Sequence, residues 1–223
     1  MDQPQRSFEL LKAGDTEGLL RLLDETPGAA DAKDAAGVSL LMHTLYRGRR
    51  ELAEAVAVKK RTLDIFEAAS LGRLEQLKEH LRDSATLNSF SPDGFTALHF
   101  ACFFGQPEAA RVLLERGAKV AVVANNQTHV MPLHSAASAR NLEAARLLLE
   151  YGAPVNARQQ AGWVPIHAAA QNGDAPMVDL LLQHGADADI ANDEGKTAAA
   201  IAQEKGHTQL VAILSLGQQK TKS

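Results

Sequence analysis

DGFTALHFACFFGQPEAARVLLERGAKV, residues 93–120, is a stretch whose pattern returns twice further along the chain. Its histidine, His99, has counterparts in His134 and His167, at spacings of 35 and 33 residues. The glycine 18 residues after each histidine repeats at the same spacings, and a fourth copy follows at residues 195–217. Self-similarity at a period near 33 residues predicts one supersecondary unit stacked several times.

The residues within one copy predict two antiparallel helices. Pro107 suits the first turn of the second helix, because its missing N–H is not needed there. Ala110, Leu113 and Leu114 recur at i, i+3 and i+4 and give that helix one apolar stripe. Gly117 then suits the left-handed residue that ends a helix. A single pair of helices cannot bury its apolar face alone, so neighbouring pairs must stack.

The repeated motif resembles the ankyrin repeat. The resemblance is carried by residues 96–99 (TALH), 132–134 (PLH) and 165–167 (PIH), followed by alanine pairs, leucine runs and a closing Gly-Ala. It is specific over residues 93–200 and weaker on either side. The resemblance implies an all-α solenoid of stacked helix-turn-helix units, each with a β-turn and a finger-like loop.

We expect a single domain over residues 1–217, because no linker rich in Gly, Pro or Ser interrupts the repeats. Gly48 and Gly72 are only 24 residues apart, so the loop before Ile65 must be nearly absent. Residues 218–223 are expected to form a disordered tail. The expected units are a worn N-terminal cap (5–31), 34–60, a short divergent unit (62–91), 93–126, 127–160, 161–193 and a C-terminal cap (194–217).

Composition and charge exclude several classes of function. A net charge of −4 argues against binding to nucleic acid or to acidic membranes. No apolar run has the length of a signal peptide or approaches the roughly 18 residues of a membrane helix. The single cysteine, Cys102, allows no disulfide within the chain and no thiolate metal cage. We therefore expect a cytoplasmic protein, and we expect it to be a monomer.

The chain offers little that points to catalysis. His99, His134 and His167 would form a row, but stacked units lie about 10 Å apart. A shared zinc ion needs each nitrogen within about 2.1 Å. The resemblance implies that these histidines are structural and bind the backbone and the threonine three residues before, which only Thr96 retains. No catalytic motif or phosphate-binding loop is present, so we predict no catalytic residue, no metal ligand and no cofactor.

The resemblance places the binding surface on the concave side of the stack, formed by the short helices and the fingers. The two positions before each inter-helix glycine face this groove. They are occupied by Tyr46 and Arg47, Ser70 and Leu71, Phe103 and Phe104, Ser138 and Ala139, Gln171 and Asn172, and Glu204 and Lys205. The N-terminal half of the groove is thus apolar and aromatic. Exposed apolar patches often mark interaction sites, and aromatic anchors carry much of the binding energy.

The predicted partner-binding residues fall into three groups. The first is an apolar anchor formed by Tyr46, Leu71, Phe103 and Phe104. Phe95 and Trp163 are expected to contribute to the same surface, as are Asn125 and Asn126 on the long finger (residues 122–130). An equally plausible interpretation is that the finger has no binding role. The alternative for Phe100, Phe103 and Phe104 is a core role, in which they cover the gap left by the short loop. Trp163 has a similar alternative, since it could pack on the neighbouring finger.

Arg140 departs from the repeat pattern, because it stands where the other copies have glycine between their helices. A positive φ at that turn would cost an arginine roughly 1 kcal/mol.

The predicted function is a non-catalytic protein–protein interaction module, a scaffold or inhibitor whose groove holds a protein partner. The first alternative is a regulatory protein that responds to a small molecule bound at the aromatic patch. The least favoured alternative is a metal-dependent enzyme that uses the histidine row.

Overall fold

The protein is described here by a computed structural model that covers residues 3–26 and 28–220. Within these residues the chain forms fourteen α-helices and three short 3-10 helices. The described part contains no strand, only an isolated antiparallel bridge between Lys33 and Ser39. The all-α class predicted from the repeat is therefore confirmed.

The α-helices follow one another in pairs along the chain. They are α1 (Gln3–Ala13), α2 (Thr16–Glu25), α3 (Leu40–Tyr46), α4 (Arg50–Lys59), α5 (Ile65–Leu71), α6 (Leu74–His80), α7 (Ala97–Phe103), α8 (Pro107–Glu115), α9 (Pro132–Ser138), α10 (Leu142–Glu150), α11 (Pro165–Asn172), α12 (Ala175–Gln183), α13 (Ala198–Glu204) and α14 (Thr208–Lys220). The 3-10 helices are η1 (Ala29–Asp31), η2 (Ser84–Thr86) and η3 (Gln160–Gly162). The division into seven units stays a prediction. Residues 218–220 of the expected tail are the last residues of α14, and residues 221–223 lie outside the described residues.

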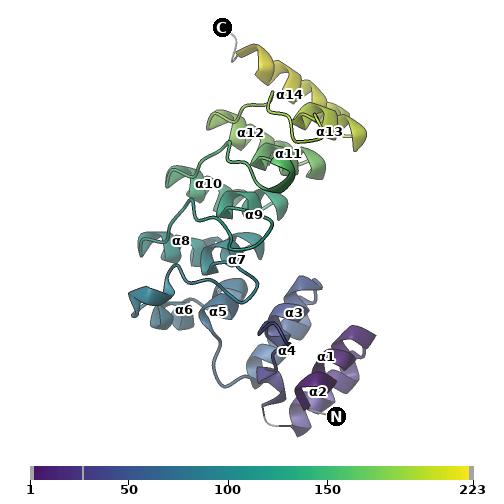
Figure 1. Cartoon of the computed structure of the whole chain (residues 1–223), viewed down its shortest axis with the longest axis vertical. Helices are drawn as coiled ribbons and strands as arrows, with labels where there is room; N and C mark the ends of the chain where they lie inside the picture. The colour runs from purple at the N-terminus through teal and green to yellow at the C-terminus, as the bar shows by residue number, and fades with distance from the viewer. Residues whose placement is uncertain (1–2, 27, 221–223) are drawn as a thin grey trace.

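The helices from α5 onward stack in two layers (Figure 1). The inner layer consists of α5, α7, α9, α11 and α13, and the outer layer of α6, α8, α10, α12 and α14. Large side chains from both layers fill the space between them, and each fully buried one stabilises the fold by roughly 1.5–3 kcal/mol. They include Leu98, Leu113, Leu133, Leu148, Ile166 and Leu181.

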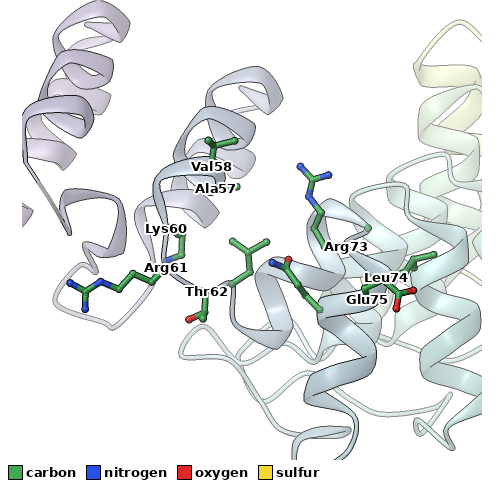
Figure 2. A pocket seen from close by; sticks show the side chains of 11 residues that line it. Ala57, Val58, Lys60, Arg61, Thr62, Arg73, Leu74 and Glu75 are labelled. Carbon is green, nitrogen blue, oxygen red and sulfur yellow. The ribbon is translucent and has the colours of Figure 1, made fainter.

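The stack is interrupted between α4 and α6. Outer helices on either side of this point pack closely on their neighbours, whereas α4 and α6 make few contacts, among them an ion pair between Glu54 and Arg73, the residue before α6. Figure 1 shows the block formed by α1–α4 displaced to one side of α5 and α6. A cavity of about 610 Å³ lies between α4 and α6, with Val58, 78% exposed, on its rim. Figure 2 shows this cavity, with Lys60 on one side and Arg73 and Leu74 on the other.

An ion pair connects the two sides of this interruption. Lys60 follows α4, and its Nζ lies 3.1 Å from Oε1 of Glu67 on α5 and 3.4 Å from Asp31. The side chains of Lys60 and Glu67 are both buried, although Oε1 forms no hydrogen bond of regular geometry. The other oxygen, Oε2, accepts the backbone N–H of Asp64 at 3.0 Å and so caps α5. This carboxylate therefore fixes the start of α5 and the end of the α1–α4 block together.

Arg140 has the left-handed backbone that its position in the repeat requires, with a φ of 58°. Its side chain is largely exposed, and Nε lies 3.7 Å from the Asp174 carboxylate. An exposed ion pair of this length contributes little to stability, so the backbone strain is the larger effect.

We expect Arg140→Gly to raise the free energy of unfolding by about 0.5–1 kcal/mol, because glycine adopts a positive φ without strain. Urea denaturation followed by circular dichroism measures the change. The control is Arg140→Ala, which loses the ion pair and keeps the strain, and which should be no more stable than the wild type. Equal stability of the glycine and alanine variants would contradict the prediction.

Candidate protein-binding site

Five aromatic side chains from α3, α7 and the loop before α7 form what we call the aromatic cluster: Tyr46, Phe95, Phe100, Phe103 and Phe104. The ring centroids of Phe100 and Phe104 are 6.2 Å apart and nearly parallel, and those of Phe103 and Phe104 are 5.2 Å apart and perpendicular. Tyr46 lies 6.1 Å from Phe104 and 6.5 Å from Phe100. These are favourable distances for aromatic pairs.

Local sequence accounts for the arrangement. Phe103 and Phe104 are three and four residues after Phe100, so all three side chains lie on neighbouring parts of one helix surface. Tyr46 ends α3, and its ring meets rings of α7 although α5 comes between them in the chain.

Tyr46 is held in place by its hydroxyl group. The hydroxyl donates a hydrogen bond to the carboxylate of Asp93, which also accepts one from the Ser91 hydroxyl at 2.5 Å. Burial, together with the hydrogen bond to Asp93, raises the pKa of Tyr46. Tyr46 therefore stays a neutral donor at physiological pH, and the Asp93 carboxylate is already occupied within the chain.

The cluster has a buried base and an exposed edge. Phe100 is only 3% exposed and belongs to the core, and Phe95 and Phe104 are half-buried against it. Phe103 and Tyr46 are 47% and 42% exposed and form the edge that a partner could reach. Of the three phenylalanines for which the sequence left a core role open, Phe100 is thus in the core, Phe104 is half-buried and Phe103 is exposed.

Leu71 does not join this edge. It is 4% exposed and packs in the core, so we leave it out of the proposed surface. Its placement in the groove assumed the same spacing between the N-cap and the inter-helix glycine in every unit. In α5 that spacing is one residue shorter, from Asp64 to Gly72, than the spacing from Thr96 to Gly105 around α7. The groove positions of the other units therefore do not transfer to α5.

A small pocket of about 130 Å³ opens within the cluster. It is lined by Tyr46, Phe95, His99, Phe100, Phe103 and Ser135. Ser135 occupies in α9 the position that Phe100 occupies in α7, and this difference in size leaves the hollow. Sequence reasoning missed Ser135 and His99 as lining residues. The contrast between a large and a small residue at equivalent positions of adjacent units is the signal that could have found the pocket.

The residues that line the pocket carry three polar groups, which are the Tyr46 hydroxyl, the His99 imidazole and the Ser135 hydroxyl. Both nitrogens of His99 are bonded, because Nδ1 accepts the backbone N–H of Thr96 at 3.2 Å and Nε2 donates to the carbonyl of Val130 at 3.1 Å. Burial lowers the pKa of His99 to about 4, so it is neutral at physiological pH. Among the described residues, the Ser135 hydroxyl has no hydrogen-bond partner. It is therefore the polar group in the pocket that is available to a bound molecule.

The other two histidines of the row are bonded in the same way. His134 accepts the N–H of Met131 and donates to the carbonyl of Ala157, at 3.0 and 2.9 Å. His167 accepts the N–H of Val164 and donates to the carbonyl of Ile190, also at 3.0 and 2.9 Å. Burial lowers the pKa of both imidazoles. Each histidine thus ties its inner helix to the next finger, even without a threonine before it.

The long finger docks on the loop before α7. The Asn126 amide donates to the carbonyl of Asp93 at 2.8 Å, and its oxygen accepts the N–H of Thr128 at 3.0 Å. The backbone N–H of Asn125 donates to the carbonyl of Gly94 at 2.7 Å. A Cβ on Gly94 would lie 2.4 Å from the Asn125 oxygen, so this contact requires glycine. Asn126 supports the finger, and Asn125 has the exposed side chain.

Trp163 is not part of the pocket. It is half-buried, and its ring lies 5.6 Å from that of His167. Phe95, two units earlier and at the pocket, packs in the same way on His99, at 5.8 Å. The structure thus brings Tyr46, Phe95, Phe103 and Phe104 together and leaves Trp163 two units away.

Within residues 3–26 and 28–220, no helix is long and apolar enough to cross a bilayer. In the same part of the chain, no three His, Cys, Asp or Glu side chains gather closely enough to hold a metal ion.

Comparison with known proteins connects the stack to one family. The family model for ankyrin repeats (three copies) matches residues 65–159 and 154–223, which is more than half of the chain. The human DNA-binding protein RFXANK is 37% identical over 113 residues, 49% of this chain and 43% of that protein. Its mouse counterpart is 32% identical over 136 residues, 52% and 51% of the two chains. The human ankyrin repeat and SOCS box protein 11 is 33% identical over 98 residues, 44% and 29%. The matched stretch spans about half the length of these relatives or less.

Proposed function

Since this chain belongs to the ankyrin-repeat family, we propose that it is a non-catalytic protein–protein interaction module that holds a protein partner against the aromatic cluster. The observation that carries the proposal is the exposed edge of the cluster. Phe103 and Tyr46 present large aromatic surfaces to solvent around an apolar pocket, in a chain with only 4% aromatic residues. Such residues are typical anchors of protein interfaces.

The dimensions of the pocket favour a protein partner over a small molecule. Sites for drug-sized ligands or cofactors usually enclose about 300–1,000 Å³. The pocket at the cluster measures about 130 Å³, which suits one side chain of a larger partner. The small-molecule alternative therefore has less support at this position.

The histidine row does not support the enzyme alternative. Both nitrogens of His99, His134 and His167 are engaged by backbone groups. A general base or a metal ligand needs a free nitrogen directed at the reacting group or the ion. We therefore propose that this row serves only to connect the units.

We further propose that the protein acts as a scaffold or inhibitor in the cytoplasm and binds protein rather than nucleic acid. One relative is named a DNA-binding protein, so nucleic acid is the alternative partner to compare with protein. Nucleic-acid binding depends on neutralising phosphates with clustered cations, and this chain has a net charge of −4. The buried Cys102, the single cysteine of the chain, suits a reducing compartment.

We expect Phe103→Ser to abolish capture of the partner from native cell lysate without changing the free energy of unfolding by more than about 0.5 kcal/mol, as for a surface residue. Affinity capture with mass spectrometry and thermal melting measure the two effects. Tyr151→Ser is the matched control, since Tyr151 is 44% exposed at the end of α10 and outside the cluster. Equal capture by both variants would contradict the proposed site.

A further inference from the structure

We infer that the partner segment held by this groove is uncharged and inserts one large apolar side chain, of the leucine, methionine or phenylalanine kind, into the aromatic pocket. The inference rests on the proposed function and adds the chemistry of the bound segment.

The floor of the groove across α7, α9 and α11 has no formal charge, and the charged Glu204 and Lys205 lie further along, at the end of α13. The exposed side chains of the inner helices α7, α9 and α11 are Phe103, Ser138 and Gln171. The half-buried Ala139 and Asn172 beside them are also uncharged. A charged side chain placed over this floor would lose water without gaining an opposite charge, and such burial is costly. A neutral segment pays no such penalty.

Charged groups around the pocket are engaged within the chain. The Asp93 carboxylate accepts hydrogen bonds from Tyr46 and Ser91. The Arg47 guanidinium, next to Tyr46, donates to the carbonyl of His43 at 3.2 Å, and Arg140 lies beside Asp174. Asp93 and Arg140 are thus engaged within the chain, whereas Arg47 is exposed, bonds only to His43 and keeps its positive charge on the α3 side of the pocket. The electrostatic match of the floor over α7, α9 and α11 is therefore with a neutral segment.

The pocket selects the anchor by size and polarity. A volume of about 130 Å³ accommodates one aliphatic or aromatic side chain, and its walls are rings and one free hydroxyl group. The free Ser135 hydroxyl can form one hydrogen bond with a backbone group beside the anchor. Because α3, the loop before α7, α7 and α9 all contribute to the walls, the bound segment must cross the inner helices.

The test is selection of peptides from a displayed library of random 12-residue sequences on the full chain, with a parallel selection on Phe103→Ser. We expect enriched peptides to share one Leu, Ile, Met or Phe without Asp, Glu, Lys or Arg in the two residues on either side. For a synthetic copy of one such peptide, the Kd should change less than about twofold between 50 and 500 mM NaCl, since no charge pair is screened. Lysine or glutamate beside the anchor should weaken binding about tenfold or more.

A second variant tests the pocket itself. Ser135→Leu places extra carbon atoms in the hollow without adding charge, and should abolish binding of the same peptide while the helical circular dichroism spectrum is retained. Retained binding by this folded variant would overturn the assignment of the anchor to the pocket.

The remaining outcomes separate this inference from the proposed function. Enriched peptides with charges beside the anchor, or a Kd that rises steeply with salt, would overturn the inference and leave the interaction module in place. Peptides that bind wild type and Phe103→Ser equally would overturn both. No enrichment would overturn the inference, and lysate capture would then decide the proposed function. A dimer in sedimentation that is lost in Phe103→Ser would make a second copy of the chain the occupant and overturn it too.

Discussion

Replacing Phe100 by alanine is expected to lower the free energy of unfolding by about 3–5 kcal/mol, the range for a large aromatic residue removed from a core. Phe100 is almost fully buried, and its ring contacts those of Tyr46, Phe66, Phe95 and Phe104. The substitution removes the packing that joins α3, α5 and α7, so the loss exceeds that of an ordinary surface variant. Chemical denaturation of the purified variant measures it.

The exposed neighbour provides the comparison for this result. Phe103→Ala should change stability by less than about 1 kcal/mol, because nearly half of that side chain is already in solvent. Phe100→Leu should fall between the two, since leucine fills part of the space. Similar losses for Phe100→Ala and Phe103→Ala would mean that the cluster has no buried base, and the edge proposed as a binding surface would have to be reassigned.

Replacing Lys60 by methionine is expected to cost about 3–5 kcal/mol of stability, because it leaves a buried carboxylate without its cation. Glu67 lies at the core of the interruption between α4 and α6, and Lys60 is 3.1 Å away. Asp31, the second carboxylate beside Lys60, is itself negatively charged and cannot replace the lysine. Denaturation with guanidinium chloride, followed by helical circular dichroism, measures the loss.

The double variant Lys60→Met/Glu67→Gln is the matched control. Glutamine keeps an acceptor for the Asp64 N–H but carries no charge, so nothing ionised remains buried. We expect the double variant to recover at least half of the stability lost in Lys60→Met. Additive losses from the two substitutions would show that Lys60 and Glu67 are not coupled, and would contradict the prediction.

The repetitive part of the fold could be predicted from sequence because each unit repeats the same residue types at the same spacing. Pro107 begins an outer helix, and the histidines of residues 99, 134 and 167 each bind the next finger, as the resemblance implied. These interactions depend on residues within one unit or its direct neighbour. A pattern of spacings is therefore enough to locate them.

The candidate site could be predicted only in part, because it depends on how unequal units meet. Phe103 and Tyr46 were found from their positions before the inter-helix glycines, and both are exposed. Leu71 is buried instead, because the spacing from the N-cap of α5 to its glycine is one residue shorter than in α7. The pocket itself comes from the pairing of Phe100 with Ser135 across two units, which no single unit reveals.

The sparse contact between α4 and α6 has a consequence for folding. In a solenoid each unit is stabilised only by its neighbours, so a weak interface divides the chain into separate cooperative blocks. The cavity of about 610 Å³ lies at such an interface, with α1–α4 on one side and the longer stack on the other. Tyr46 belongs to the first block and Phe103 to the second. A partner that contacts both residues would therefore strengthen the coupling between the two blocks and make them fold as one.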